Sequence, residues 1–537
     1  MRRVGLFFVL ILLGARASMS SEMEAVPITP ATLPRIATVD ERYQSYNVEI
    51  AEAIGGKFWK PYDKAALAEV PKPKRPQATI SGSTSPTQVG ADPSMFQARP
   101  PVDLTNARLR KLAAALGPAY VRVSGSWANS VYFHDEDTPP PSSAPNGFDG
   151  VLTRRQWRGA IDFARAVNAQ LVTSFAISAG VRDVAGVWTP VEARKLMRYT
   201  HDIGGHIDAA EMFNEPDMPT YAGAPAGYTA QSYAQDFAVF APFIRSAAPD
   251  MRIVGPGSVS EGLLGPQSAA KAMPGFISTE AMMTARPRPV FDVFSYHFYP
   301  AVSVRCAGIS AEAQTTREAA LSEEWLARTD RGYDFYVTGI RDRYQPGKPV
   351  WITETAESAC GGNPWANAFL DTFRYVDQMG RLARRGVSVI FHNTLASSEY
   401  GLLDQRTFHP RPNYWAALLW RRLMGTTVLD AGQSRPGLHQ YAHCLRGHPG
   451  GVALLLINNS RTNPSSVELP TASERFTLSA HGLEDGEVLL NGTALRLGPG
   501  DELPALNGSP ASAGRVVLPP ATITFLVLSN AGNLVCQ

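Results

Sequence analysis

The chain has 537 residues, more than one ordinary domain holds, and apolar residues make up 44% of it. This composition is typical of a packed globular protein and excludes a disordered one. The formal net charge is only +2, and no long run of lysine or arginine occurs, so we expect no nucleic-acid partner.

The N-terminus has the pattern of an export signal. Arg2 and Arg3 precede the apolar stretch VGLFFVLILLG, and small residues at Ala15 and Ala17 fit a cleavage site. We therefore expect residues 1–17 to be a signal peptide. The alternative is a membrane anchor, but the apolar stretch is shorter than the roughly 20 residues that cross a bilayer. We expect a mature chain without a membrane span that is secreted or periplasmic.

An alternation of short β-branched runs and longer helical patterns fills most of the chain. It follows a segment at 18–40, from which the run RIATVD could add a strand to a later sheet, and contains a proline-rich loop at about 70–100. The expected strands are at 43–53, 119–126, 170–178, 206–215, 252–258, 290–299, 348–355 and 387–393. Eight such repeats predict a (β/α)₈ barrel over residues 41–425. An open doubly wound sheet is the alternative, but no G-x-G-x-x-G follows a strand.

A different pattern begins after the last of these helices. Short apolar runs such as GVALLLINNS and ATITFLVLSN are separated by Gly, Asn and Pro. They predict a β-sandwich domain over residues 426–537.

Two glutamates stand where two of the expected barrel strands end. Glu215 ends the fourth strand within Asn-Glu-Pro, and Glu354 ends the seventh within VWITET. Barrel enzymes carry their chemistry at this end of the strands, so both carboxylates should meet at one mouth. Such a pair suits glycoside hydrolysis, and Asn214 could donate to a sugar hydroxyl. Each glutamate could instead be an ordinary loop carboxylate, and Glu357 is a rival to Glu354 from the following loop.

Longer segments resemble one family of retaining barrel glycosidases. They are LRKLAAALGPAYVRVSGSW, MFNEPD, FDVFSYHFY, GKPVWITETAESACGGN, GLLDQRTFHPRPNYWAALLWRRLMGTTVL and FLVLSNAGNLVCQ. In this order they are similar to heparanase and its relatives in glycoside hydrolase family 79. The resemblance implies a retaining β-glucuronidase that needs no cofactor or metal, with Glu215 as acid/base and Glu354 as nucleophile.

The resemblance also implies contacts to the sugar. Tyr299 would orient the nucleophile with His297 beside it, and Glu49 and Ser126 would make polar contacts from the first two strands. Gly361, Gly362 and Tyr400 would hold the uronic carboxylate. Consecutive glycines do let backbone N–H groups approach an anion, and a tyrosine hydroxyl adds a donor. The glycines could also simply turn the chain, and His297 could be a packed core histidine.

Four cysteines suit an exported protein and allow three pairings. The resemblance implies one of these pairs, a Cys444–Cys536 disulfide, because YAHC and NLVC match paired positions of the family. Pairing of Cys306 with Cys360 stays open.

The substrate and the mode of cleavage leave several alternatives. We expect removal of a β-linked glucuronic acid by a monomer. An endo-acting enzyme on heparan-sulfate-type chains, a xylosidase or glucosylceramidase of the same clan, and a carbohydrate-binding protein without catalysis are the other readings. The proline-rich loop lacks basic processing sites, and no basic run suggests a highly sulfated ligand.

Overall fold

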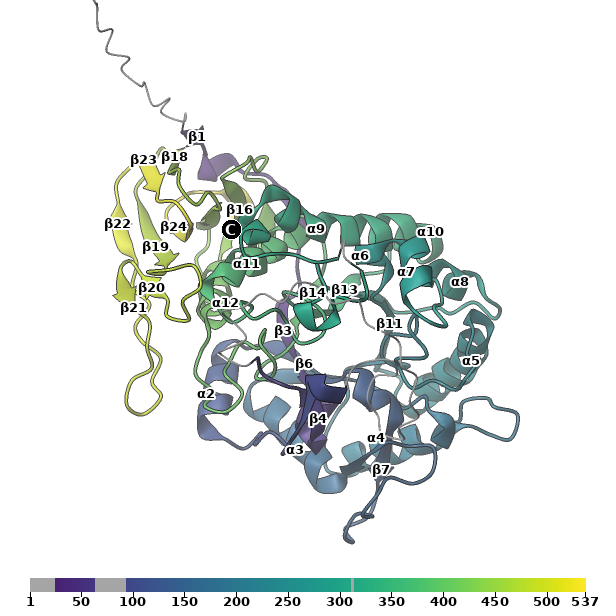
Figure 1. Ribbon diagram of the computed structural model, residues 1–537. Helices are drawn as coiled ribbons and strands as arrows, with labels where there is room; N and C mark the ends of the chain where they lie inside the picture. Colours follow the sequence, from purple (N-terminus) through teal and green to yellow (C-terminus); the bar gives the residue numbers. More distant parts are fainter. Residues whose placement is uncertain (1–24, 63–92, 311–312) are drawn as a thin grey trace, which may run out of the picture.

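The computed structural model describes residues 25–62, 93–310 and 313–537, and Figure 1 shows their arrangement. Eight parallel strands close into a barrel, which confirms the predicted fold and rules out the open sheet. In order around the barrel they are β3 (Gln44–Glu49), β6 (Ala119–Ser124), β9 (Ala169–Ser174), β10 (Ala209–Glu211), β11 (Arg252–Ser258), β12 (Val293–Phe298), β13 (Val350–Thr355) and β14 (Val389–His392). The expected signal peptide lies outside the described residues.

Helices surround the barrel (Figure 1). They are α1 (Ile50–Ile54), α2 (Ala107–Ala115), α3 (Arg154–Ala166), α4 (Val191–Asp202), α5 (Ala230–Ala247), α6 (Glu261–Leu264), α7 (Pro266–Ala272), α8 (Thr279–Thr284), α9 (Glu323–Tyr333), α10 (Asp342–Tyr344), α11 (Phe369–Arg384) and α12 (Pro412–Leu423), with a π-helical stretch at Asp334–Arg341. In α3, the side chains of Thr153 and Gln156 cap the first turn reciprocally, and Trp157, Ile161 and Ala164 bury one face.

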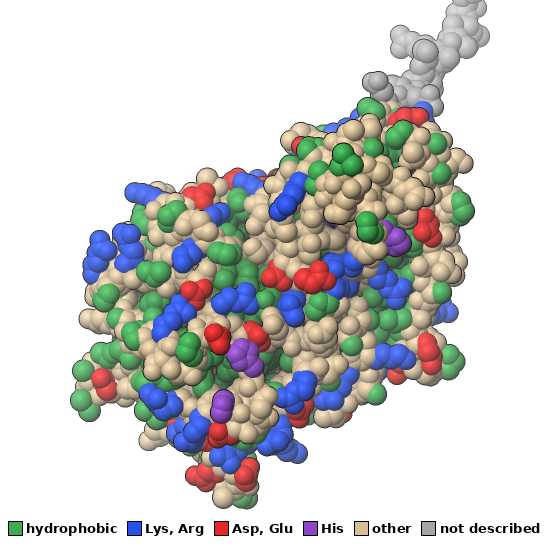
Figure 2. All heavy atoms as spheres, turned by 180° about the vertical axis from the view of Figure 1, so that it is seen from behind, with side chains coloured by type: hydrophobic (Ala, Val, Ile, Leu, Met, Phe, Trp, Pro, Cys, Tyr) green, Lys and Arg blue, Asp and Glu red, His purple; other side chains and the backbone are tan. Residues whose placement is uncertain are grey.

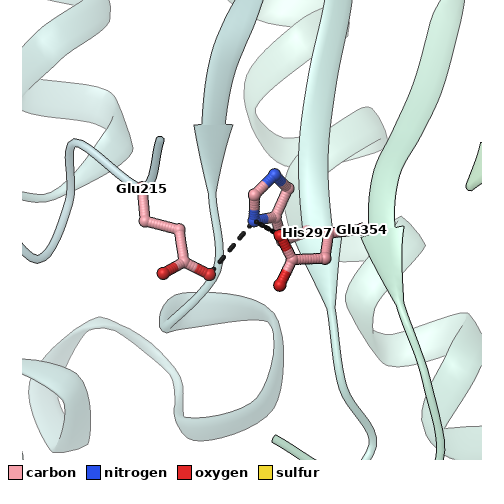
Figure 3. Close-up of side chains that lie close together, drawn as sticks. All are labelled: Glu215, His297 and Glu354. Carbon is pink, nitrogen blue, oxygen red and sulfur yellow. Dashed lines mark hydrogen bonds and ion pairs between the residues drawn. The ribbon is translucent and has the colours of Figure 1, made fainter. Parts of the chain in front are cut away.

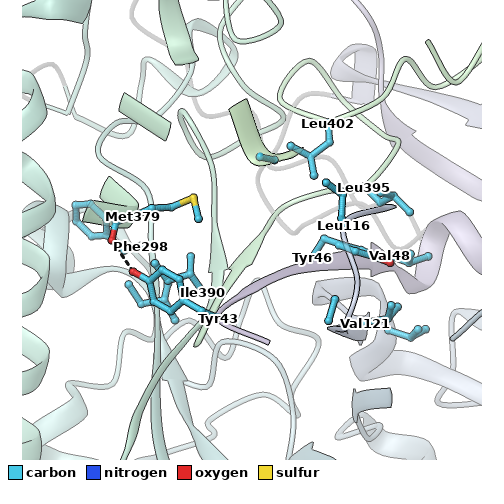
Figure 4. Close-up of a cluster of buried hydrophobic side chains, with 14 of the residues drawn as sticks. Tyr43, Tyr46, Val48, Leu116, Val121, Phe298, Met379, Ile390, Leu395 and Leu402 are labelled. Atoms are coloured by element: carbon cyan, nitrogen blue, oxygen red, sulfur yellow. Dashed lines mark hydrogen bonds between the residues drawn. The ribbon is translucent and has the colours of Figure 1, made fainter. Parts of the chain in front are cut away.

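The core between strands and helices is apolar and closely packed. Figure 4 shows the part around β3, where Tyr46, Val48 and Leu116 lie together. Tyr43 is buried in the same core, and its hydroxyl donates to the carbonyl of Met379 at 2.6 Å, which satisfies its polar end.

The C-terminal region is a sandwich of two sheets. The larger contains β2 (Arg35–Thr38), β15 (Met424–Leu429), β16 (His439–Leu445), β17 (Val452–Asn458), β24 (Thr522–Leu528), β19 (Ser473–Ser479), β20 (Leu489–Leu490), β21 (Thr493–Ala494) and β22 (Ser509–Ala511). The smaller contains β1 (Val26–Pro27), β18 (Ser465–Leu469) and β23 (Gly514–Leu518). Both N-terminal strands therefore belong to the sandwich, β1 beside β18 and β2 beside β15.

Strand β17 is buried on both faces, which explains its unbroken apolar sequence. Leu454 and Leu456 point into the core between the two sheets. Leu455 and Ile457 belong to the core that continues into the barrel. The sandwich thus packs onto the barrel through β17, whose two faces contribute to the two cores.

Two small two-stranded sheets lie outside the barrel sheet, the first antiparallel and the second parallel. One pairs β4 (Gly56–Trp59) with β5 (Phe96–Arg99), and the other pairs β7 (Val131–His134) with β8 (Gly150–Thr153). Because β5 lies within the expected proline-rich loop, the irregular part ends earlier than predicted. The stacking of Phe96 on Trp59, with ring centroids 4.6 Å apart, holds this strand. Residues 63–92 of that loop lie outside the described residues.

The surface carries charges of both signs, interspersed on the face shown in Figure 2. Within the described ranges, no helix combines the length and the apolar character needed to cross a membrane.

A buried charge network joins the sandwich to the barrel. His439 of β16 lies between Asp377 of α11, at 2.6 Å, and Glu323 of α9, at 2.8 Å. Burial alone would lower the pKa of His439, but the two carboxylates outweigh it and raise this pKa to about 9. The imidazolium is therefore the stable form at neutral pH.

The cysteines form two disulfides. Cys444 of β16 is bonded to Cys536 near the C-terminus, and Cys306 is bonded to Cys360 on neighbouring barrel loops. The first closes a span of 92 residues within the sandwich.

We predict that replacing Cys444 and Cys536 together by serine lowers the free energy of unfolding by about 2–5 kcal/mol, because the unfolded chain loses a cross-link. Urea unfolding followed by circular dichroism measures it. The barrel should keep its fold without denaturant, since the bond lies in the sandwich. An unchanged unfolding midpoint would contradict the prediction.

We also predict that His439→Gln destabilises in a pH-dependent way. The folded pKa of about 9 exceeds the ordinary value of 6.5, so the stabilisation is complete below pH 6.5 and is lost as pH rises through 9. The difference from wild type should be about 2–3 kcal/mol at low pH.

His443 on the same strand provides the matched control. Burial lowers its pKa to about 4, so its contribution is lost as pH falls from 6.5 towards 4. The pH dependences of His439→Gln and His443→Gln should therefore have opposite signs in denaturant titrations. Parallel curves would refute the assignment of the charge on His439.

Candidate active site

Glu215, His297 and Glu354 meet at the carboxyl ends of the barrel strands (Figure 3). Glu215 follows β10, His297 is in β12 and Glu354 is in β13, where the last two are register partners. His297 Nδ1 lies 3.1 Å from Glu215 Oε1 and 3.7 Å from Glu354 Oε2. One oxygen of each carboxylate and this nitrogen all lie within 4.8 Å of one another.

The backbone around Glu215 is clamped by one side chain. Asn129 accepts from the N–H of Asn214 and donates to its carbonyl, both at 2.8 Å. The next residue, Glu215, has φ of 53°, in the left-handed region that non-glycine residues seldom adopt. The amide clamp thus fixes an unfavourable backbone conformation, which aims the carboxylate into the mouth.

Arg122 of β6 is fully buried and contacts both Glu354 and Asn214, the residue before Glu215. Its guanidinium donates to Glu211 of β10 at 2.8 Å, to Glu354 at 3.1 Å and to the side chain of Asn214 at 2.6 Å. Burial opposes a charge here, but Glu211 and Glu354 outweigh it and raise the pKa of Arg122. Neither Arg122 nor Glu211 was among the predicted site residues. The signal was present in each case, a charged residue inside an otherwise apolar strand.

His297 is neutral. Burial lowers its pKa to about 4, more than the neighbouring Glu354 raises it. Nε2 of His297 faces the guanidinium of Arg122, 3.4 Å from an Nη2 whose two hydrogens are directed at Glu211 and Asn214, so a proton on Nε2 would point at a cation. The ring proton is then on Nδ1, which faces Glu215. His297 is fully buried, and its Nδ1 contacts both carboxylates instead of packing only against apolar side chains.

The two carboxylates have different surroundings. Burial raises the pKa of Glu215 to about 7, with Arg122 and Ser126 opposing the rise. Burial also raises the pKa of Glu354, but this carboxylate accepts from Arg122 and, at 2.5 Å, from the hydroxyl of Tyr299. The group with more donors holds its negative charge better, so Glu215 is the better proton carrier.

Asn393, just after β14, connects Glu354 to a second part of the site. Its side-chain nitrogen lies 2.9 Å from the hydroxyl of Tyr299, 3.3 Å from Glu354 and 3.2 Å from the hydroxyl of Tyr400. Sequence reasoning missed this residue, because an asparagine at a strand end is common.

A tight turn at Cys360–Gly362 lies next to Tyr400. All three residues have positive φ, and a Cβ on Gly361 or Gly362 would lie 2.7 Å from Trp59 or 3.0 Å from Ala366. Only glycine fits there.

The carbonyl and N–H groups of this turn differ in whether they have partners. The carbonyls of Cys360, Gly361 and Gly362 accept from Ser303, the N–H of Glu399 and Tyr62, respectively. Within the described part of the chain, no group accepts from the N–H of Gly361 or Gly362, although both glycines are buried. Buried N–H groups without an acceptor are rare, so the turn presents a donor surface suited to an anion.

The remaining predicted residues lie around the same mouth. Ser126 donates to Glu215 at 3.2 Å and accepts from Asn214 at 3.3 Å. Glu49 ends β3 beside Gly125, and burial followed by the charge of Glu354 raises its pKa well above the usual range. One of its oxygens has no partner among the described groups.

The sequence left Glu357 as a rival to Glu354, but the structure gives Glu357 a different role. It accepts from the backbone and side-chain nitrogens of Asn363, at 2.8 and 2.9 Å, and from Ser358. It therefore holds the end of the glycine turn and is occupied by these bonds.

Glu215, His297 and Glu354 have the spacing of metal ligands as well. The guanidinium of Arg122, 3.1 Å from Glu354, already provides positive charge at this point. A divalent cation would meet like-charge repulsion from it.

A cavity of about 640 Å³ opens beside the glycine turn. Tyr62, Trp365 and Glu399 are among its lining residues, whereas Glu215 and Glu354 are not. It adjoins the site without containing the carboxylate pair.

Comparisons with known proteins agree with this geometry. A family model described as "Glycosyl hydrolase family 79, N-terminal domain" matches residues 100–380. Heparanase-like protein 1 of Arabidopsis thaliana is 26% identical over 484 residues, which cover 86% of this chain and 78% of that protein. Hyaluronoglucuronidase of Hirudo nipponia is 24% identical over 481 residues, which cover 81% and 92%, respectively.

Among solved structures, a 4-O-α-L-rhamnosyl-β-D-glucuronidase from Fusarium oxysporum 12S has a similar fold. Its TM-score is 0.62 at 13% identity, over 94% of this chain and 99% of the other. The family model spans more than half of the chain and includes both carboxylates that meet at the mouth. The chain is thus a glycoside hydrolase and belongs to glycosyl hydrolase family 79.

Proposed function

We propose that this protein is a retaining β-glucuronidase that removes terminal β-linked glucuronic acid from glycans or glycosides. The observation that carries the proposal is the donor surface of the Cys360–Gly362 turn beside a buried carboxylate pair. A neutral sugar needs no anion site, whereas a uronic acid carries a carboxylate on the carbon next to its ring.

Glu354 is the proposed nucleophile. It attacks the anomeric carbon while Glu215 gives its proton to the leaving oxygen, and a covalent glycosyl-enzyme forms. Water then attacks the anomeric carbon, Glu215 takes up a proton from it, and the sugar is released with its original configuration. An approach of the carboxylate oxygens within 4.8 Å supports this mechanism, because inversion leaves roughly 6.5–9.5 Å between the groups for a water molecule.

The other residues orient these two groups and the sugar. Tyr299 donates to Glu354 and fixes its rotamer, while the neutral His297 donates to Glu215 from Nδ1. Asn214, Ser126 and Glu49 are proposed to contact sugar hydroxyls. Gly361, Gly362 and Tyr400 are proposed to bind the carboxylate.

We infer that the enzyme works outside the cytoplasm, secreted or periplasmic, as a monomer. Two disulfides support an oxidising compartment.

One observation favours an endo-acting alternative on longer glucuronic-acid-containing chains. Cleavage within a chain needs room on both sides of the bond, and the 640 Å³ cavity beside the glycine turn could receive further sugar units. A binding protein without catalysis is disfavoured, because both carboxylates are present at the mouth and their surroundings differ. The pKa of Glu215 is raised to about 7, whereas Glu354 accepts from Arg122.

The deciding experiment compares purified enzyme on aryl β-glucuronide and aryl β-glucoside, together with size analysis of digested heparan sulfate. We expect strong preference for the glucuronide and release of the terminal sugar alone. Equal rates on the two aryl substrates would refute the glucuronidase assignment, and a ladder of shortened chains would replace exo with endo action.

We predict that Glu354→Gln abolishes turnover, whereas Glu215→Ala retains activity on a dinitrophenyl glucuronide and is partly rescued by azide. An activated leaving group needs no proton, and azide fits the space that the carboxyl vacates. For wild type, kcat/KM on a poor leaving group should fall as pH rises through about 7, because Glu215 must be protonated in the free enzyme. Stopped assays across pH 4–9 measure this, and persistence of the basic limb in Glu215→Ala would disprove the assignment.

We predict that Tyr400→Phe reduces glucuronide turnover more than glucoside turnover. The ring stays and only the hydroxyl is removed, whose proton no described group accepts. The cost in kcat/KM on the glucuronide should be about 1–3 kcal/mol, the range for hydrogen bonds to charged groups. Equal losses on both substrates would show that Tyr400 does not contact the carboxylate.

A further inference from the structure

We propose that Arg305 determines the preference for a uronic acid, as a positioning residue that stands behind the glycine turn without touching the sugar. The proposal rests on the proposed function. No arginine was visible from the sequence in the loops expected to bind the carboxylate, yet the structure places this one against the turn.

Arg305 lies in the loop after β12 and joins three loops of the barrel mouth. Its Nη1 donates to the carbonyls of Cys360 and Gly362, at 3.1 and 3.2 Å. Its Nη2 donates to the carbonyl of Lys60 at 2.6 Å, in the loop beyond β4. The ring of Tyr62 covers the guanidinium, whose central carbon is 3.7 Å from the ring centroid.

These bonds organise the turn for an anion. Arg305 takes the carbonyls of Cys360 and Gly362, and the first of these lies in the peptide plane that carries the N–H of Gly361. The next peptide plane, which carries the N–H of Gly362, is held by the bond from the N–H of Glu399 to the carbonyl of Gly361. Because N–H and C=O point in opposite directions in a trans peptide, the N–H of Gly361 points away from the guanidinium, and no described group accepts from it. A nest of N–H groups held in advance binds an anion without reorganising.

The guanidinium also contributes positive charge close to the turn. A Cβ on Gly361 would lie 2.9 Å from Arg305 Nη1, and Nη1 donates to the carbonyl of the peptide that carries the N–H of Gly361, so the cation is adjacent to that peptide. Burial lowers the pKa of Arg305, but a guanidinium stays charged throughout the working pH range. The carboxylate of Glu399 is 3.9 Å from Nη2, whereas the two carbonyls of the turn accept from Nη1.

The neighbouring contacts make this arrangement rigid. The Cys306–Cys360 disulfide connects the residue after Arg305 to the first residue of the turn. The loop that carries the cation and the loop that carries the donors are therefore covalently joined next to the proposed binding site.

Arg182 supplies a matched control. Its side chain is also 7% exposed, stacks on a tyrosine (Tyr228, at 5.4 Å) and donates to the carbonyls of Ile177 and Gly186. It lies in the loop after β9, away from the glycine turn, and its charge is paired with Asp236 at 2.6 Å.

The test measures kcat and KM of wild type, Arg305→Met and Arg182→Met on aryl β-glucuronide and aryl β-glucoside. For Arg305→Met we expect the ratio of kcat/KM values, glucuronide over glucoside, to fall about ten-fold or more, mainly through a higher KM for the glucuronide. Arg182→Met should leave that ratio at the wild-type value. Arg305→Gln, which keeps donors but removes the charge, should also lower the ratio and serves where the methionine variant does not fold.

An unchanged ratio in a folded Arg305 variant would overturn the inference, as would an equal fall in Arg182→Met. The proposed function fails by a different result, a wild-type enzyme without any preference for the glucuronide. The two failures are therefore distinguishable within one set of assays.

Discussion

The guanidinium of Arg122 is the interaction on which the rest of the site depends. It is fully buried in the barrel interior, where a lone charge would be very costly, and two carboxylates balance it. Glu211 alone would neutralise it, so the second carboxylate, Glu354, adds a negative charge that the surroundings must stabilise. The donors on Glu354 offset that excess, whereas burial and the charge of Arg122 keep the imidazole of His297 neutral in spite of it. The same cation also holds the side chain of Asn214 and thereby the segment leading to Glu215.

Exclusion of water strengthens each of these interactions. Glu215 and Glu354 are 7% and 6% exposed, and the residues that bind them are buried. In such surroundings charges and dipoles interact more strongly than in water, so small differences in donors separate two otherwise identical side chains. The division of labour between the carboxylates is therefore a property of their neighbours and not of their position in the sequence.

The sequence predicted those parts of the molecule that repeat or that end a strand. Alternating patterns placed all eight barrel strands, and strand ends pointed to Glu215 and Glu354, because a parallel barrel brings all such ends to one face. It could not reveal Arg305, whose partners are backbone carbonyls of other loops and leave no trace in residue type. Glu357 looked like a rival of Glu354 for a similar reason, since only the folded chain shows that Asn363 occupies it. Arg122 in β6 and Glu211 in β10 could have been found from the sequence, because each is a charged residue within an apolar strand. A search for apolar runs alone does not detect them.

The strand order also sets the sequence of events during synthesis. The first barrel strand, β3, pairs with the last, β14, and the strands before it pair with the sandwich, whose final long strand ends at Leu528. As the chain emerges from the ribosome, the leading segment has to wait for partners that are translated some 350 to 450 residues later. The barrel cannot close before β14 has been made, and the sandwich cannot be completed before β24, which ends at Leu528 of 537 residues. Closure of each part thus comes late in its synthesis, and until then the apolar strands at the start of the chain lack their native neighbours.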